Sequence, residues 1–141
     1  MRALRRKQRG ITFITVLLLL AVLGGVYWVM TFGSAYWENQ EIKSIMKEAG
    51  NLAYNERNDN IVRDFIEKKL RERFQTGSDH GRPILAIDYE PADIRIERTD
   101  QPKFIHIWFT YSRTVKTPFT GNERQVTFAD HIEQDLSPVK W

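Results

Sequence analysis

The feature that most constrains this chain is an uncharged apolar run from Ile11 to Phe32. As a helix rising about 1.5 Å per residue, the run spans about 33 Å, which is enough to cross a bilayer core of about 30 Å. Amphipathic aromatic residues, which favour a membrane interface, gather toward its far end at Tyr27 and Trp28. We therefore predict a membrane-spanning helix over residues 11–32.

The charges on either side of this run are asymmetric. Residues 1–10 contain five basic residues and no acidic one, whereas Glu38 and Glu41 follow the run. Because short cytoplasmic segments are rich in Lys and Arg, the asymmetry predicts a basic cytoplasmic leader over residues 1–10. The remainder would then lie across the membrane. The expected location is a bacterial inner membrane, crossed once, with the C-terminal domain in the periplasm.

Two other interpretations of the run are weaker. The apolar region of a cleaved secretory signal is usually about 7–15 residues long, which is shorter than this one. Gly33-Ser34-Ala35 nonetheless has the small residues of a signal cleavage site, so removal stays open as an alternative. A buried helix of a soluble protein is disfavoured, because a run this long and apolar on all sides does not fit so small a core.

The net charge of +3 reflects the leader alone. Removing the five leader bases from the 21 Lys and Arg residues leaves 16, against 18 acidic residues. This slightly acidic remainder gives no support to a nucleic-acid surface. The chain has no cysteine, which excludes disulfides, thiolate metal sites and cysteine-based catalysis.

The stretch RGITFI, residues 9–14, resembles the start of a type IV prepilin. In that family a short basic leader ends in Gly, and a cut after this Gly leaves an apolar helix that begins with a residue such as Ile or Phe. The resemblance implies a processing site between Gly10 and Ile11. It departs at the fifth position after the cut, where the family usually has a Glu that pairs with the N-terminal amine of a neighbouring subunit.

That fifth position is Thr15 here. A buried amine without a carboxylate partner is costly in lipid, so a filament-building major pilin is disfavoured. A cleaved minor pilin or pseudopilin, of a type IV pilus or a type II secretion system, stays as the alternative to an uncleaved anchor.

Nearly the whole chain also resembles the single-span bacterial proteins grouped as domain of unknown function four-eight-four-five. The matching stretches are, in order, RRKQRGIT, IEKKLRERF, DIRIERTD and VKTPFTGNERQVTF. The resemblance implies a pilin-like start followed by a small α+β domain. It bears on the architecture and the location of the protein and implies no mechanism.

Residues 33–57 are predicted to form an amphipathic helix and a connector. The apolar spacing of Ile42, Ile45, Met46 and Ala49 is helical, and we expect the helix to end near Gly50-Asn51. Gly24-Gly25 and Gly33 offer places for a bend.

A second helix is expected to begin at the capping cluster of residues 58–60 and to end at Gly77. Its apolar face would consist of Ile61, Val62, Phe65, Ile66, Leu70 and Phe74.

Four strands are predicted over residues 84–89, 93–99, 103–115 and 124–132, of which the third is apolar on both faces and therefore central. The expected fold class is α+β: an N-terminal transmembrane helix, then one or two helices packed on a small antiparallel sheet of about four strands. Residues 58–136 would form the periplasmic domain, and residues 137–141 a tail.

Side chains capable of chemistry are sparse. His80 falls in a loop, whereas His106 and His131 fall on two strands that a hairpin can bring together. Either Asp130 or Glu133 could join them, but Asp130 and His131 point to opposite faces, because side chains alternate along a strand. The spacing matches no metal-binding motif.

The acidic residues Asp88, Glu90 and Asp93 surround Pro91 without the spacing of a calcium loop and fit a turn at a strand end. We therefore expect no catalytic, cofactor or metal site, and no nucleic-acid or small-molecule ligand. The expected partners are the lipid bilayer and other membrane or pilin-like proteins, in a structural or assembly role. A membrane-anchored enzyme remains a remote alternative.

Overall fold

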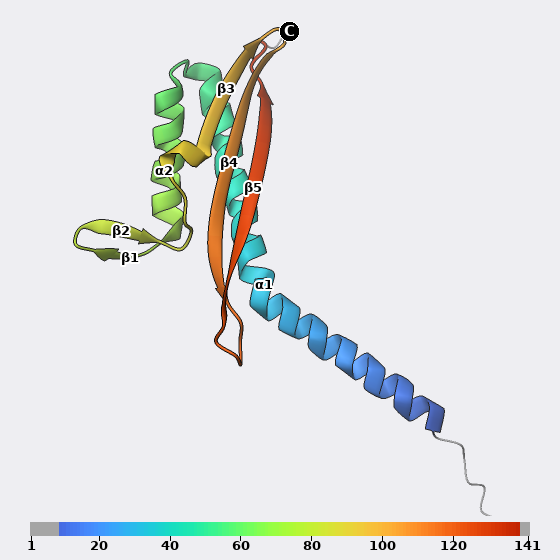
Figure 1. The fold of residues 1–141 in the computed structure, drawn as a ribbon. Coiled ribbons are helices and arrows are strands. Elements are labelled where there is room, and N and C mark those ends of the chain that lie inside the picture. Colours follow the sequence, from blue (N-terminus) through green and yellow to red (C-terminus); the bar gives the residue numbers. More distant parts are fainter. Residues whose placement is uncertain (1–8, 139–141) are drawn as a thin grey trace, which may run out of the picture.

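The computed structural model describes residues 9–138, with side chains from Thr12 onward. The predicted leader, apart from its last two residues, and most of the predicted tail lie outside the described residues. The elements are α1 (Arg9–Asn55), α2 (Asp59–Phe74), β1 (Gln75–Asp79), β2 (Arg82–Leu85), the 3-10 turn η1 (Pro91–Asp93), β3 (Ile94–Asp100), β4 (Lys103–Lys116) and β5 (Glu123–Asp135). The fold is α+β, as predicted: two helices with antiparallel sheets of two and three strands (Figure 1).

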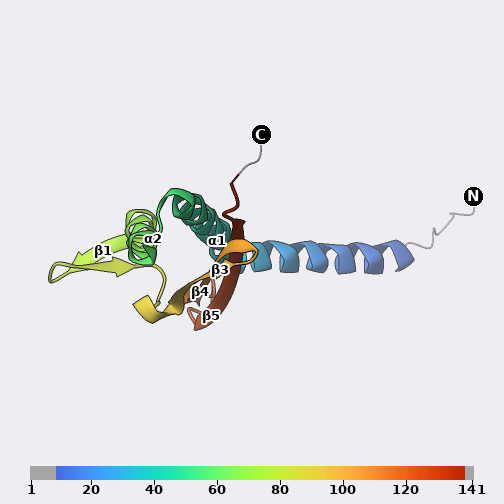
Figure 2. The same cartoon turned by 90° about the horizontal axis from the view of Figure 1, so that it is seen from above.

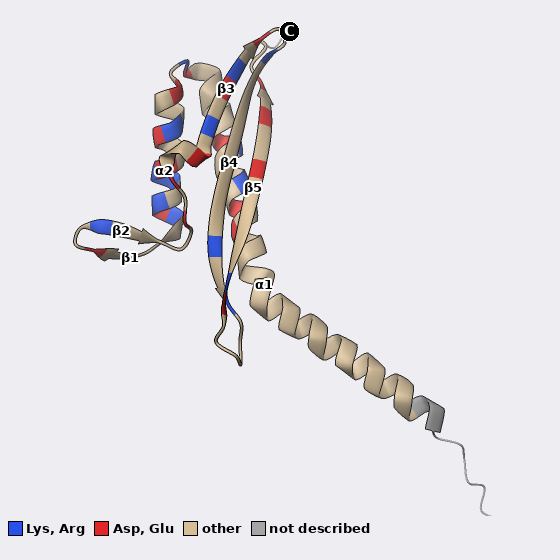
Figure 3. Cartoon of the chain, in the orientation of Figure 1, with Lys and Arg blue, Asp and Glu red and all other residues tan. Residues whose placement is uncertain are grey.

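The predicted membrane helix and the predicted amphipathic helix form one unbroken helix, α1, of 47 residues. Large apolar side chains of its first half are exposed, from Phe13 to Met30, and no charged residue lies among them (Figure 3). In its second half, Ile42 and Met46 are completely buried against the domain. Within the part of the chain described, α1 is the one helix long and apolar enough to cross a membrane.

The helix α1 changes direction near the place where it meets the sheet (Figures 1 and 2). This part of α1 includes Gly33 and Ser34, and Gly/Ser pairs are a common cause of helix bending.

The expected end of α1 near Gly50-Asn51 was wrong, because the helix continues to Asn55. Gly50 is buried, and a Cβ atom there would lie 3.2 Å from Cβ of Gln134 on β5. The glycine therefore serves the close approach of α1 to the sheet and does not end the helix.

The second helix, α2, begins as predicted, with the Asn58 side chain accepting a hydrogen bond of 3.0 Å from the amide of Asn60. Its end was predicted wrongly. Gln75 already has an extended backbone, so the chain passes from Phe74 straight into β1, and Gly77 lies within that strand. Four residues of the predicted apolar face are buried, namely Val62, Ile66, Leu70 and Phe74.

The main sheet has the order β3-β4-β5, with β4 central as predicted. It contains three strands, because the segment predicted as a first strand, residues 84–89, does not join it. Its beginning pairs with β1 in a separate hairpin, and Asp88 meets β4 in a single bridge to Ser112. Between them, the Ala86 amide donates to the Phe74 carbonyl and the Ala86 carbonyl accepts from the Arg113 side chain, so both groups bond to partners other than the backbone of the main sheet.

Alternate residues of β4 form the core. Ile105, Ile107, Phe109 and Tyr111 are buried, and they share one cluster with the apolar faces of α1 and α2. Both helices thus cover the same face of the sheet, and the other face stays open.

Candidate functional site

The most distinctive region is the junction at which the exposed half of α1 becomes a core helix. Thr31, Ala35 and Asn39 lie one turn apart and are each at most 4% exposed, whereas the preceding residues face outward. The Thr31 hydroxyl is satisfied locally, because it donates a 2.8 Å hydrogen bond to the carbonyl of Tyr27. The domain therefore begins to cover α1 at Thr31, next to the predicted end of the span at Phe32.

Asn39 is the centre of a polar cluster between α1 and the sheet. Its side-chain amide donates to the hydroxyl of Tyr111 at 2.9 Å and to the carboxylate of Asp130 at 2.5 Å. Lys43, one turn along the helix, lies 3.4 Å from the same carboxylate. Burial, only partly offset by the hydrogen bond from Asn39, raises the pKa of Tyr111 to about 12, so this phenol stays neutral at physiological pH.

A second polar contact lies beside the first. Glu38 Oε2 and Arg113 Nε are 2.8 Å apart, and another nitrogen of Arg113 donates to the carbonyl of Ala86 at 2.9 Å. Burial raises the pKa of Glu38, and the positive charge of Arg113 opposes this rise in part. Together with the Asn39 cluster, this ion pair fixes α1 on the sheet just beyond the exposed apolar half.

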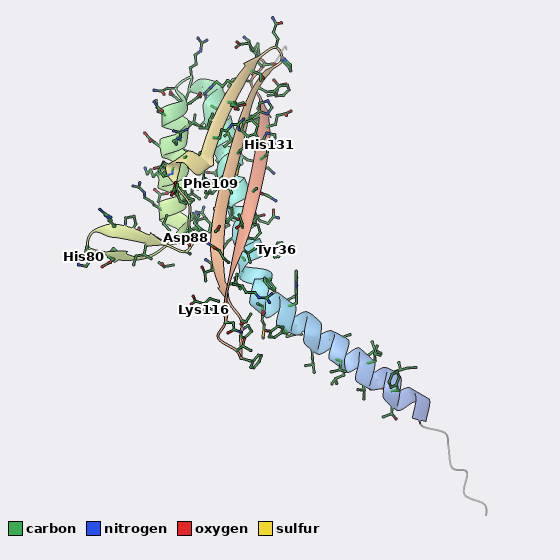
Figure 4. All side chains as sticks on the ribbon, in the orientation of Figure 1. Tyr36, His80, Asp88, Phe109, Lys116 and His131 are labelled. Atoms are coloured by element: carbon green, nitrogen blue, oxygen red, sulfur yellow. The ribbon has the colours of Figure 1, made fainter. Side chains whose placement is uncertain are left out.

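A series of aromatic contacts connects the exposed half of α1 to the core. The ring centroids of Trp28 and Tyr36 are 5.8 Å apart. The rings of Tyr36 and Phe128 pack edge to face, with their centroids also 5.8 Å apart. Phe128 stacks on Tyr111 at 5.3 Å, which in turn stacks on Phe109 at 5.2 Å. Apolar packing is therefore continuous from the membrane-compatible segment to the middle of β4 (Figure 4 labels Tyr36 and Phe109).

The two strand histidines come together on the open face of the sheet. His106 Nδ1 lies 3.3 Å from His131 Nε2 and 3.6 Å from a carboxylate oxygen of Glu133. Asp130 points to the opposite face, toward Asn39, as side-chain alternation predicted. Trp108 stacks on His131 at 4.8 Å and holds the guanidinium of Arg95 over its ring at 4.7 Å. We call Arg95, His106, Trp108 and His131 the histidine–tryptophan patch.

The other chemical candidates lie apart from this patch. His80 is at the tip of the β1–β2 hairpin, where its Nδ1 lies 2.6 Å from the carboxylate of its neighbour Asp79. Glu90 and Asp93 bond to each other around Pro91 and cap η1, which matches the predicted turn. Asp88 is exposed near the start of that turn (Figure 4).

Across the described part of the chain, no three His, Asp or Glu side chains are arranged to hold a metal ion. One concave surface of the described residues is an open depression along the charged face of α2 between Asp64 and Gln75. An open, highly charged depression differs from the largely apolar pockets that usually bind small molecules.

The suggested processing site lies at the start of α1. The backbones of Gly10 and Ile11 are helical, and the Ile11 side chain lies outside the described residues. Phe32, the other end of the predicted span, lies inside α1 with its ring 5.9 Å from Trp28. Neither end of the predicted span is therefore an end of the helix itself.

Comparison of the chain with protein families, with curated proteins and with solved structures finds no match. The architecture itself, a long apolar N-terminal helix whose second half packs on a small antiparallel sheet, is consistent with that of pilins.

Proposed function

We propose that this chain is a single-pass protein of a bacterial inner membrane, pilin-like in build, which presents a small periplasmic domain for interaction with other envelope proteins. One observation supports this most: α1 is a single helix, exposed and apolar in its first half and buried in the domain in its second. Its role would be structural or in assembly, and the similarity to domain of unknown function four-eight-four-five stays part of the proposal.

The contacts at the junction favour a domain that is held rigidly on α1 over one that is joined to it by a flexible linker. Asn39 and Glu38 fix α1 to the sheet within two turns of Phe32, so the domain is held close to the membrane at a set orientation. A flexible linker would instead let the domain sample many positions.

The histidine–tryptophan patch is the surface that we propose the domain presents. Trp and Arg are the residue types that most often dominate the affinity of protein interfaces. Here the stacked Trp108 and Arg95 are bordered by the exposed carboxylates of Glu97 and Glu133. We propose no catalytic role for the two histidines.

Intact mass of the membrane-extracted protein tests the leading proposal against its alternative. An uncleaved anchor keeps its full-length mass in strains with and without a prepilin peptidase. A cleaved minor pilin or pseudopilin, which the exposed first half of α1 also suits, loses residues 1–10 and begins at Ile11 only when the peptidase is present. Proximity crosslinking in membranes tests the patch: Trp108→Ala should remove crosslinked partners, and Thr127→Ala, an exposed change elsewhere on the open face, should keep them.

A further inference from the structure

The loop between β4 and β5 places an exposed aromatic residue beside the apolar half of α1. Phe119, at the tip of this loop, is 95% exposed. Its ring stacks with that of Tyr27, with centroids 6.3 Å apart and planes 20° from parallel. We propose that residues 117–122 enter the outer interface of the lipid bilayer that α1 spans, with Phe119 as a second anchor.

The height of the contact supports this assignment. Tyr27 precedes Phe32 by five residues, so along the helix it lies about 7 Å inside the predicted span. Interfacial segments bury their apolar side chains about 5–10 Å into the boundary between headgroups and acyl chains. A ring in contact with Tyr27 therefore lies at lipid level if α1 crosses the membrane, so the inference rests on the proposed function.

The loop is also built to enter an apolar environment at low cost. Residues 117–122, TPFTGN, carry no charge. The Thr117 amide donates to the Asn122 carbonyl at 2.9 Å, and the Gly121 amide to the Thr117 carbonyl at 3.1 Å. The Thr117 hydroxyl lies 2.7 Å from that of Thr120. Because these polar groups bond within the loop, they lose less on leaving water than unpaired groups would.

The backbone of Phe119 adds a separate argument. Its φ angle is +76°, a left-handed conformation that Gly or Asn adopts more easily than a bulky aromatic residue. A Phe in this conformation, with almost its whole side chain outside the protein, contributes little to the fold. Contact with lipid gives the exposed ring a favourable environment.

Charged residues at the base of the loop lie where the proposal places the lipid headgroups. Lys116, labelled beside the loop in Figure 4, pairs with Glu123 at 3.1 Å, and Arg124 is exposed next to it. Basic side chains near a membrane surface reach anionic lipid headgroups while the apolar residues beyond them lie deeper.

Site-directed spin labelling tests the proposal on the full chain, because the protein has no cysteine of its own. Three single variants, Phe119→Cys, His80→Cys and Leu19→Cys, would be labelled with a nitroxide and reconstituted in phosphatidylcholine–phosphatidylglycerol vesicles. His80 is the matched control, since it too is an exposed hairpin-tip residue with positive φ, and it lies on a hairpin that points away from α1 (Figure 1). Leu19 reports the apolar half of α1 itself.

The measurement is the collision rate of each label with oxygen, which concentrates in lipid, relative to a water-soluble nickel chelate. We expect the oxygen-to-nickel ratio at 119 to be clearly higher than at 80 and lower than at 19. A ratio at 119 equal to that at 80, with a high ratio at 19, overturns the inference and leaves the proposed function intact. A low ratio at 19 overturns both. Dipolar broadening of the nitroxide spectrum at position 119 would mean that labels on two copies lie close together. If this broadening disappears when the protein is diluted with lipid, a second copy covers the loop and the inference is overturned.

Discussion

Asn39 and Tyr111 are 72 positions apart in the sequence, and the amide of the first donates a 2.9 Å hydrogen bond to the buried hydroxyl of the second. This bond joins the helix that begins in the apolar run to the central strand of the sheet. Because Asn39 also donates to Asp130, one side chain connects α1, β4 and β5.

Replacing Asn39 by Leu should therefore weaken the fold. The change removes the donor from the Tyr111 hydroxyl and from Asp130, and a buried polar group left without a partner costs about 1–3 kcal/mol. We expect a fall of that size in the free energy of unfolding, measured by denaturant titration of the full chain in detergent. Gln40→Leu, an exposed neighbour on α1, is the control and should change stability by less than about 0.5 kcal/mol. Equal effects of the two variants would contradict the role of Asn39.

Alkaline pH should destabilise the fold through Tyr111. Its pKa of about 12 in the folded protein lies above the ordinary value of 10.0, so the unfolded chain loses this proton first. The contribution is fully present below pH 10 and is lost as the pH rises toward 12. Between pH 9 and pH 11 this group alone should lower the free energy of unfolding by about 1 kcal/mol. In Tyr111→Phe, the free energy of unfolding should fall correspondingly less over the same range. If it falls equally with pH in both proteins, Tyr111 is not the group responsible.

Arg98 holds the end of α1 and the start of α2 on β3. Its guanidinium donates to the carbonyls of Ala53 and Glu56, at 3.3 and 2.7 Å, and lies 2.6 Å from the carboxylate of Asp59. A cation on the last carbonyls of a helix is favourable, and hydrogen bonds to charged groups contribute about 1.5–3 kcal/mol. Arg98→Met should destabilise the protein by about this amount in thermal or chemical unfolding. Arg124→Met, at an exposed position of β5, should be close to neutral, and a neutral Arg98→Met would contradict the assignment.

Two glycines of the same helix should respond in opposite ways to a large side chain. A Cβ atom on Gly50 would lie 3.2 Å from Cβ of Gln134, so a Leu side chain has to displace Gln134 or move α1 from β5, and overpacking of this kind typically costs about 1–3 kcal/mol. Gly25, in the exposed apolar half, has no atom within 4 Å of an added Cβ, so Leu should be tolerated there. The near-ultraviolet circular dichroism and the unfolding midpoint of Gly50→Leu and Gly25→Leu test this contrast. Equal tolerance would show that α1 does not need its close contact with the sheet.

Much of the fold could be predicted because its signals are local. The long apolar run of α1, the cap at Asn58, the alternation along β3 and the continuous apolar run of β4 each belong to one element. The separate hairpin was missed, although His80 and Gly81 form a two-residue turn with φ of +48° and +81° between paired Asp79 and Arg82. The dipeptide His80-Gly81 is a usable sequence signal for such a hairpin, because Gly readily adopts the positive φ that the turn needs.

The polar contacts of the junction could not be predicted, because they depend on tertiary register. Even so, the pattern contained a hint: Asn39 falls on the same helical face as Ile42 and Met46, and Arg98 on the same strand face as Ile94 and Ile96. A polar residue on an apolar face needs a partner in the core, but the sequence does not say which one. The meeting of His106 and His131 likewise depended on the register of β4 and β5, whereas the separation of Asp130 from His131 followed from strand alternation alone.

The central claim is that α1 crosses the membrane and holds the domain on its outer side. Its most direct test is the labelling of single cysteines in intact cells by a membrane-impermeant maleimide, at exposed Asp100→Cys on β3 and at Gln8→Cys in the basic leader. The account predicts that position 100 reacts in intact cells, with the protein kept in the carbonate-washed membrane fraction. Position 8 should not react before the membrane is permeabilised. Reaction at position 100 only after permeabilisation, or a domain released into the soluble fraction, would contradict it.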